Sequence, residues 1–387
     1  MTRSRLLGLA VGAGALVLTA SAANAEEIPV SGPTTYTVTG HGWGHGHGLS
    51  QYGAKGAAGQ GVGWKQILGF YYPGTGLGRV RGTVSVLITA DTSKDVMVDA
   101  RDGLRLRPLT GTKSFVLDKL RPRATRWRIL PKGTRSVVQF KARSGGWTTW
   151  TAVPGEAEFT AGSKPVTLRL PGHATASYRG SLRSVEKHTV NVLPLDRYVR
   201  GVVPREVPTS WPADAIRAQA VAARTYAAYE RATATTYYDL CDTSSCQVYG
   251  GADAEDPAAT AAVRATSGRV VTYQGQPAFT QFSSSNGGWS SAGSQPYLVA
   301  QPDPYEAASG NPYASWSTTL TSAQIQQTWP QIGTLTAISL TRDGNGDFGG
   351  RVTKAVFTGT SGIVTVTGDD VRSLMGDAGR STWFRLT

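Results

Sequence analysis

Residues 40–49, GHGWGHGHGL, alternate glycine with His41, Trp43, His45, His47 and Leu49. If this segment is an extended strand, these five side chains project from one face and the other face is bare backbone. Glycine inside a strand often marks the close approach of a ligand or of another backbone. A histidine metal site and a glycine-rich structural strand are alternatives. We favour a ligand wall, because an indole can stack on a sugar ring and histidines can hydrogen-bond to its hydroxyls.

Glu206 is the second group that could do chemistry. It lies in YVRGVVPREVPTSWP, residues 198–212, where its close neighbours are valines and prolines apart from Arg205. A carboxyl in apolar surroundings tends to keep its proton, as a general acid at neutral pH must. Arg205 and the N-terminus of a helix expected downstream would favour the ionised form instead. On the residues alone, a surface glutamate in a loop is the alternative to a catalytic acid.

A serine-rich loop and a cysteine pair complete the polar candidates. The loop FTQFSSSNGGWSSAG, residues 279–293, holds Ser283, Ser284 and Ser285 but has no G-x-S-x-G elbow, so we expect it to hydrogen-bond a ligand rather than to attack one. Cys241 and Cys246 are the only cysteines. In an oxidising compartment such a pair forms a local disulfide, whereas zinc would need two more ligands and no histidine is near.

An alanine-dominated helix is expected over residues 209–234, TSWPADAIRAQAVAARTYAAYERATA. Its alanines allow close approach to other backbone, so the helix should be buried. Gln219 and Tyr226 share one stripe of this helix. Arg224, between alanines, is expected to be buried and to order its surroundings, because a buried charge must find partners.

Strands dominate the rest of the chain. Residues 81–185 contain VSVLITA, DVMVDA, SFVLDKL, RSVVQFKA and PVTLRL between turn residues, and further strands are expected at AISLTR, KAVFTG and IVTVTG. The DGNGD stretch at 343–347 fits a turn rather than a calcium loop. The expected class is α+β with β in excess: mixed or antiparallel strands around the buried alanine-rich helix, with an inserted or adjoining β subdomain.

Composition indicates export. Residues 1–25 read as a secretory signal, with Arg3 and Arg5 before an apolar run that ends in an A-x-A site, and no later stretch could cross a bilayer. Cleavage would lower the net charge from +13 to +11. The basic residues are spread along the sequence, and in an exported protein such a charge suits the anionic cell wall rather than nucleic acid. We expect a secreted, wall-associated protein.

Taken together, these stretches resemble the stage II sporulation protein D family, or SpoIID/LytB-domain proteins, of bacterial cell walls. The resemblance rests on YVRGVVPREVPTSWPADAIRAQAVAARTYA, CDTSSCQVYGG, FSSSNGGWSS with the following QPYL, and GHGWGHGHGLSQYGAKGAAGQGVGWKQILGFYYPGT. The ending VTGDDVRSLMGDAGRSTWFRL also fits. Two features depart from the family: no histidine lies near the cysteines, where zinc-binding members have them, and the HGWGHG block precedes the other motifs instead of following them.

The resemblance implies a lytic transglycosylase that cleaves glycan strands stripped of peptide stems. Glu206 takes the catalytic position, with Val207 replacing the usual methionine. It would protonate the oxygen leaving N-acetylmuramic acid and then accept the proton of the 6-hydroxyl as a 1,6-anhydro ring closes, so neither a second carboxylate nor a cofactor is needed. The substrate-binding residues would be His41, Trp43, His45, His47, Ser50, Gln51, Arg224, Ser283, Ser284 and Ser285.

The implied organisation has residues 26–80 docking on a catalytic domain at 186–387, with the β-rich subdomain 81–185 between them. The histidine and tryptophan wall should then face Glu206 across one groove. The expected partners are glycan strands and other wall hydrolases. Two rival functions stand beside the transglycosylase: a wall-binding module that enhances an amidase, suggested by the LytB branch, and a metal hydrolase using His41, His45 and His47.

Overall fold

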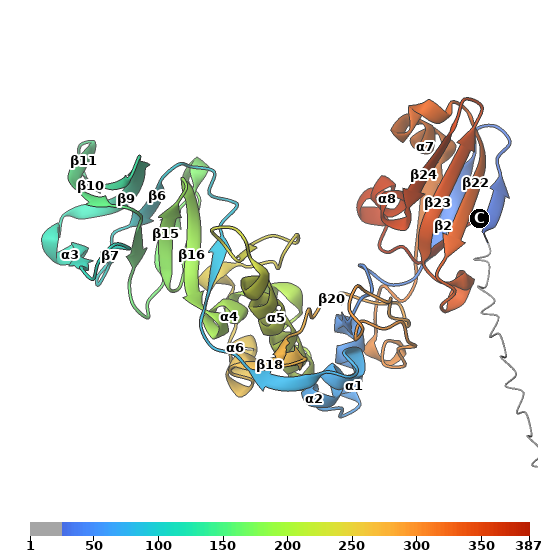
Figure 1. Cartoon of the computed structure of the whole chain (residues 1–387), viewed down its shortest axis with the longest axis horizontal. Coiled ribbons are helices and arrows are strands. Elements are labelled where there is room, and N and C mark those ends of the chain that lie inside the picture. The colour runs from blue at the N-terminus through green and yellow to red at the C-terminus, as the bar shows by residue number, and fades with distance from the viewer. Residues whose placement is uncertain (1–24) are drawn as a thin grey trace, which may run out of the picture.

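The computed structural model describes residues 25–387. The molecule is an elongated, bent arrangement with a β-sandwich at one end, helices in the middle and a second β body at the other end (Figure 1). The β-rich α+β class predicted from the sequence is confirmed. The secretory leader predicted over residues 1–25 lies, except for Ala25, outside the described residues. Within the described chain, no helix is both long and apolar enough to span a membrane.

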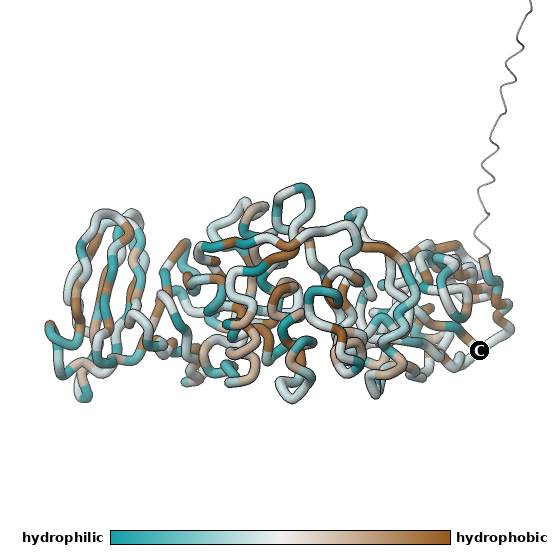
Figure 2. Tube along the Cα trace, turned by 90° about the horizontal axis from the view of Figure 1, so that it is seen from below, coloured by the Kyte–Doolittle hydropathy of each residue, from teal (hydrophilic) through white to brown (hydrophobic). Residues whose placement is uncertain are grey.

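The sandwich consists of two sheets whose inner faces share one core. Hydrophobic and hydrophilic residues alternate along many of its strands (Figure 2), as expected when one face of a sheet is buried. The six-stranded sheet, in the order β11-β10-β9-β6-β13-β14, contains β6 (Val96–Asp99), β9 (Ala124–Lys132), β10 (Arg135–Ala142), β11 (Trp147–Pro154), β13 (Val166–Arg169) and β14 (Thr175–Tyr178).

The facing sheet has seven strands in the order β17-β5-β16-β15-β12-β7-β8. They are β5 (Thr83–Leu87), β7 (Arg105–Pro108), β8 (Phe115–Val116), β12 (Ala157–Thr160), β15 (Ser181–Val185), β16 (His188–Pro194) and β17 (Leu240–Cys241). The expectation of a strand through SFVLDKL is wrong, because only its first part pairs and α3 (Leu117–Leu120) follows.

The middle layer is helical and surrounds α5 (Ala213–Thr233), the predicted alanine-rich helix. Most of the alanines of α5 are buried, which lets neighbouring elements approach its backbone closely. Its neighbours include α1 (Gln51–Gly59), α2 (Trp64–Tyr71), α4 (Leu195–Glu206), α6 (Pro257–Ala265) and the small sheet β19-β18-β4, with β4 (Gly76–Arg79), β18 (Arg269–Tyr273) and β19 (Gln276–Pro277). A parallel pair, β3 (Leu49–Ser50) and β20 (Phe282–Ser283), lies on the side toward the second β body (Figure 1).

The second β body combines the two ends of the described chain. One sheet pairs β1 (Glu26–Pro29) with β22 (Leu335–Arg342), followed by β23 (Val352–Gly359) and β24 (Ile363–Thr367). The other places β2 (Thr35–Gly40) between β21 (Trp316–Thr321) and β25 (Phe384–Leu386). The helices α7 (Ser322–Thr328) and α8 (Gly368–Leu374) accompany these sheets. The prediction of a tight turn at DGNGD is wrong, because residues 343–351 form a longer loop between β22 and β23 that contains a 3-10 segment, η5 (Asp347–Gly349). This body has its own hydrophobic cluster, which includes Val38, Ile338 and Phe357.

These boundaries differ from the division expected from the sequence. Residues 26–40 are not a docking segment but strands of the second β body, which also takes residues 316–387 from the expected catalytic domain. The expected boundary at 185 cuts the β15–β16 hairpin, whose strands pair directly. The chain therefore crosses between bodies twice: once through the glycine-rich segment after Gly40, and once through the loops before Trp316.

Candidate active site

A cavity of about 590 Å³ lies where these two crossings meet the helical layer. Its lining comes from the glycine-rich segment, the start of α1, the end of α4, α5, the cysteine loop and the serine loop. The lining residues are Trp43, Gly44, His45, Gln51, Arg205, Glu206, Tyr226, Ser244, Ser245, Cys246, Gln247, Val248, Gln281, Phe282, Ser283 and Ser284. Among these residues, Glu206 is the only carboxylic acid.

Glu206 is the last residue of helix α4, not a loop residue as its valine- and proline-rich setting suggested. Burial raises the pKa of its carboxyl, while hydrogen bonds from Gln51 and from the backbone of Val248 partly oppose that rise. The C-terminal end of a helix carries partial negative charge, which also favours the protonated form. The downstream helix α5, whose N-terminus was expected to oppose this effect, begins seven residues later at Ala213. The position suits a carboxyl that must hold a proton near neutral pH.

The glycine-rich segment is not an extended strand. Gly42, Gly44, Gly46 and Gly48 all have positive φ, between 64° and 107°, a conformation that other residues rarely adopt. The alternation of glycine therefore curls the backbone and directs the intervening side chains to different neighbours. The flat wall with five side chains on one face, expected from the sequence, is wrong.

Trp43 and His45 reach the Glu206 cavity, whereas His41 and His47 do not line it. Trp43 packs edge-on against Tyr313 with ring centroids 4.4 Å apart, and the guanidinium of Arg380 lies 4.5 Å from its ring centroid. His41 instead donates through Nδ1 to the carbonyl of Ala314 at 2.6 Å and stacks on Phe348 at 4.9 Å. We expected one groove to contain all four side chains and Glu206, but only Trp43 and His45 share the cavity with Glu206.

His45 and His47 stack on each other with ring centroids 4.9 Å apart. Nδ1 of His45 accepts the backbone N–H of His47 at 2.9 Å. Burial lowers the pKa of His45 to about 3, and the nearby His47 and Arg351 act in the same direction, so its imidazole is neutral. Across residues 25–387, no group of three or more His, Cys, Asp or Glu side chains is placed to hold a metal ion. The geometry therefore does not favour the metal-hydrolase interpretation.

Three residues assigned to substrate from the sequence are instead fully buried: Ser50, Ser285 and Arg224. Ser50 caps helix α1 by accepting the N–H of Gly53 at 3.1 Å, and it donates to Glu306. Ser285 donates to the same carboxylate at 3.1 Å. Both hydroxyls thus bond to Glu306, which does not line the cavity. We therefore correct their assignment from substrate contact to structural support.

Arg224 has the buried ordering role that its alanine neighbours predicted. Its Nε donates to Asp196 Oδ1 at 2.7 Å, and its other nitrogens donate to the carbonyls of Ala220, Val263 and Arg269 at 3.2–3.3 Å. These partners belong to α4, α5, α6 and β18. Arg224 therefore fixes the N-terminal end of the helix that ends in Glu206 and makes no contribution to the cavity lining, which corrects its assignment to substrate.

Gln51, Ser283 and Ser284 line the cavity as expected for substrate-binding residues. The side chain of Ser283 is nearly buried, and its hydroxyl has no hydrogen-bond partner among the described residues. A buried hydroxyl without a partner carries a desolvation cost that a ligand acceptor or donor could remove.

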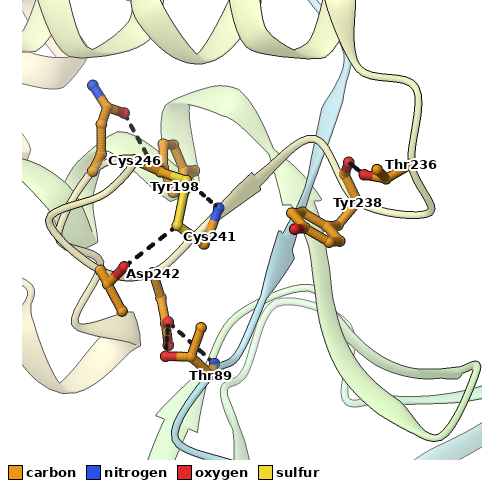
Figure 3. The surroundings of a disulfide bond; sticks show 9 residues. Thr89, Tyr198, Thr236, Tyr238, Cys241, Asp242 and Cys246 are labelled. Atoms are coloured by element: carbon orange, nitrogen blue, oxygen red, sulfur yellow. Dashed lines mark hydrogen bonds between the residues drawn. A yellow bond between two sulfur atoms is a disulfide. The ribbon is translucent and has the colours of Figure 1, made fainter.

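A disulfide joins Cys241 and Cys246, whose Cα atoms are 5.5 Å apart (Figure 3). The backbone N–H of Cys241 donates to Sγ of Cys246 at 3.0 Å, and Asp242 accepts from the hydroxyl of Thr89 at 2.6 Å. Strand β17, which contains Cys241, also pairs with β5. The disulfide and the pairing of β17 with β5 therefore hold the loop whose residues 244–248 line the cavity.

Sequence reasoning missed several lining residues, among them Tyr226, Gln247 and Arg205. Burial raises the pKa of Tyr226 to about 12, so its hydroxyl stays protonated and can donate to a ligand. A signal for Tyr226 was present, because it shares a helix stripe with Gln219. Gln247 lies within CDTSSCQVYGG, one of the stretches that carry the family resemblance, but nothing singled it out within that stretch. It reaches the cavity through the cysteine loop and donates to the carbonyl of Ala223 at 3.3 Å.

Comparison with known proteins points to one family. Residues 183–273 match the family model described as "Stage II sporulation protein" (SpoIID). The chain is 38% identical to the amidase enhancer of Bacillus subtilis (strain 168) over 133 residues, which are 33% of this chain and 17% of that protein. It is 30% identical to stage II sporulation protein D of the same organism over 185 residues, 42% of this chain and 51% of that protein. The sporulation protein of Bacillus amyloliquefaciens is 32% identical over 176 residues, 39% of this chain and 48% of that protein. The chain thus spans about half of the sporulation proteins and less of the enhancer.

Proposed function

Because the chain belongs to the stage II sporulation protein D family, we propose that it is a secreted lytic transglycosylase of peptidoglycan, acting on glycan strands without peptide stems. One observation carries this proposal. A single carboxyl group, with its pKa raised by burial, borders a cavity that also contains the indole of Trp43. Transglycosylation by intramolecular ring closure needs one carboxyl that acts first as an acid and then as a base.

In this mechanism, protonated Glu206 donates its proton to the oxygen that links C1 of N-acetylmuramic acid to N-acetylglucosamine. The C1–O bond breaks and the departing sugar keeps a hydroxyl. The 6-hydroxyl oxygen of the muramic acid then bonds to C1 and gives its proton to the Glu206 carboxylate. The products are a 1,6-anhydro end and a free 4-hydroxyl, and the carboxyl is regenerated without consumption of water.

The other cavity residues have supporting roles in this proposal. The indole of Trp43 would stack on the apolar face of a sugar ring. Gln51 would keep the Glu206 carboxyl in one orientation through its 3.4 Å hydrogen bond. Ser283, Ser284 and Tyr226 would hydrogen-bond to sugar hydroxyls or acetamido groups. The carboxyl must remain protonated until the glycan is bound, and burial favours that state.

Mass spectrometry of glycan products tests the proposal. The protein is incubated with peptide-free glycan strands and, separately, with intact peptidoglycan. Products with 1,6-anhydro ends, each lighter by one water than the hydrolytic product, support the transglycosylase. Products with reducing ends would indicate hydrolysis, and unchanged strands would leave the activity unsupported.

A second function is favoured by one specific observation: the highest identity among these relatives, 38%, is to a protein named an amidase enhancer. In that role the chain would bind the wall and raise the rate of a separate amidase without cutting glycan. The same incubation with a purified wall amidase distinguishes the two. Faster release of stem peptides without anhydro products would favour the enhancer.

A further inference from the structure

The positive charge of the chain is concentrated in the β-sandwich. Residues 81–185 contain 19 Lys and Arg against 7 Asp and Glu, a net charge of +12. The rest of residues 26–387 contains 18 basic and 19 acidic residues, a net charge of −1. No long run of consecutive basic residues produces this difference in net charge. The rest of the described chain is together nearly neutral, so the net positive charge lies within residues 81–185.

Strand register places many of these cations on the outer face of the six-stranded sheet. Trp127 and Ile129 point into the core, so the alternate residues Arg126 and Arg128 point outward. Arg126 lies directly opposite Lys141 on β10, and Lys141 lies opposite Trp147 on β11. Residues directly opposite each other in a sheet share a face. The guanidinium of Arg128 also lies 4.3 Å from the centroid of the Trp147 ring.

One end of the six-stranded sheet carries a group of cations, several of which no carboxylate neutralises. We call it the basic corner: Lys119, Arg121, Arg123, Arg126, Lys141 and Arg143. Ala124 pairs with Ala142, and the guanidinium of Arg121 lies 5.6 Å from the ring centroid of Phe140, which brings residues 121–126 beside residues 140–143. Lys119, Arg123 and Arg143 are exposed.

Acidic residues of the same sheet pair mainly with cations outside the basic corner, and Arg126 is the member of the corner that has such a partner. Asp99 lies 2.7 Å from Arg169 and 3.9 Å from Arg126, and Asp95 lies 3.3 Å from Arg128. Within the described chain, Lys119, Arg123 and Arg143 make no ion pair with a carboxylate. Three exposed and unpaired cations near one end of the sheet form a surface of positive potential.

We propose that the basic corner, together with the adjoining outer face of the six-stranded sheet, binds a phosphodiester-linked anionic polymer of the cell wall. Arginines outnumber lysines by 13 to 6 in residues 81–185, and the guanidinium fork matches a phosphate oxygen pair. An unsubstituted phosphodiester polymer carries one negative charge per repeat, which fits a surface of large excess positive charge. The choice of a wall polymer over nucleic acid rests on the proposed function.

This surface is separate from the candidate active site. Strands β9, β10 and β11 lie at the far end of the molecule from α1 and β20, which border the cavity (Figure 1). The sandwich can therefore hold the protein on one polymer while the cavity remains open to another. A two-site arrangement of this kind raises the local concentration of the cavity near its substrate.

Fluorescence anisotropy with labelled poly(glycerol phosphate) tests the proposal on the full-length protein. The test variant is Lys119→Glu, Arg123→Glu, Arg143→Glu. The matched control, Lys65→Glu, Arg264→Glu, Lys354→Glu, changes the same number of exposed charges outside the sandwich. From counterion release, we expect Kd to rise at least about tenfold for the test variant at 50 mM salt and less than about twofold for the control. The wild-type Kd should rise at least about tenfold between 50 and 200 mM salt.

A third variant with Gln at the three test positions removes the cations without adding repulsion, and it should weaken binding in the same direction by a smaller factor. Equal losses in test and control variants, or no loss in either, would overturn the proposal. If duplex DNA binds more tightly than poly(glycerol phosphate) at equal phosphate concentration, the partner of this surface is nucleic acid and not the wall polymer. Cleavage of soluble peptide-free glycan, measured in parallel, should be unchanged in the test variant. If the wild type cuts no glycan, the proposed activity fails while the binding result still stands.

Discussion

The side-chain amide of Gln51 donates a 3.4 Å hydrogen bond to Oε2 of Glu206, although the two residues are 155 positions apart in the sequence. Gln51 is the first residue of α1, directly after the capping residue Ser50, which Glu306 holds in place. The environment of Glu206 is therefore set partly by helix α1, which lies far from Glu206 in the sequence. A change at Gln51 should be visible in the protonation of Glu206.

Replacing Glu206 by glutamine should abolish most glycan cleavage. The amide keeps the shape of the side chain but cannot donate the proton, and loss of a general acid typically costs about 100-fold or more in rate. Binding of glycan should survive, because the cavity walls are unchanged. Anhydro products quantified by mass spectrometry give the rate, and native rates in the variant would eliminate the mechanism.

Gln51→Leu should move the alkaline limb of the kcat/KM profile to higher pH. The hydrogen bond from Gln51 favours the ionised form of Glu206 and lowers its pKa, so its removal should let burial raise that pKa further. Activity that requires the protonated acid would then persist to higher pH. Gln60→Leu, at the exposed end of the same helix, serves as a control and should leave the limb in place. A shift to lower pH in Gln51→Leu would contradict this assignment.

The raised pKa of Glu206 also predicts a pH-dependent stability difference. A carboxyl whose pKa is higher in the folded state stabilises the protein fully below its unfolded value, near 4.3, and this contribution is lost as pH rises through the folded value. Glu206→Gln has no such loss. The Tm of the variant relative to the wild type should therefore increase between pH 4 and pH 7, as measured by calorimetry. A difference that is constant with pH would mean that the folded and unfolded pKa values are equal.

Trp43→Ala should weaken glycan binding without unfolding the protein. Aromatic contacts contribute about 0.5–1.5 kcal/mol, so Kd should rise roughly two- to thirteenfold. Trp43→Phe keeps a ring above Tyr313 and should retain most of the affinity. Isothermal titration with glycan fragments on Glu206→Gln protein measures binding without cleavage. Undiminished binding in Trp43→Ala would return the glycine-rich segment to a purely structural role.

The cysteine loop should need no metal. The purified protein should contain no free thiol after unfolding and no stoichiometric zinc, and chelator should leave glycan cleavage unchanged. Thiol titration and elemental analysis provide the measurements. One zinc per chain together with two free thiols would overturn the disulfide assignment.

Local patterns predicted the elements that depend on nearby residues. The alanine-rich helix α5 and many sandwich strands follow from propensity and alternation over short windows. Helix α4 was also predictable, because Leu195, Tyr198, Val199 and Val202 recur at helical spacing. Pro204 argues against a helix in this segment, but a proline in the last turn removes only one backbone hydrogen bond.

The glycine-rich segment shows where such patterns fail. Alternation predicts a strand only when side chains restrict the backbone, and glycine at every second position removes that restriction. The second β body could not be predicted for another reason. Its sheets pair residues near 30 with residues near 340 and 385, and nothing local to either partner specifies the other.

The pairing of β2 with β21 and β25 also constrains the order in which parts of the chain can fold. Residues 35–40 emerge early during synthesis or export, but their strand partners lie at 316–321 and 384–386. Long-range pairings of this kind form late, after the intervening chain is available. The glycine-rich segment directly follows β2, and its Trp43 and His45 belong to the candidate cavity. An incomplete chain would therefore already contain Glu206 on α4 but would lack the strand partners of β2, so the segment that carries Trp43 and His45 would not be anchored at β2 until residues 384–386 are present.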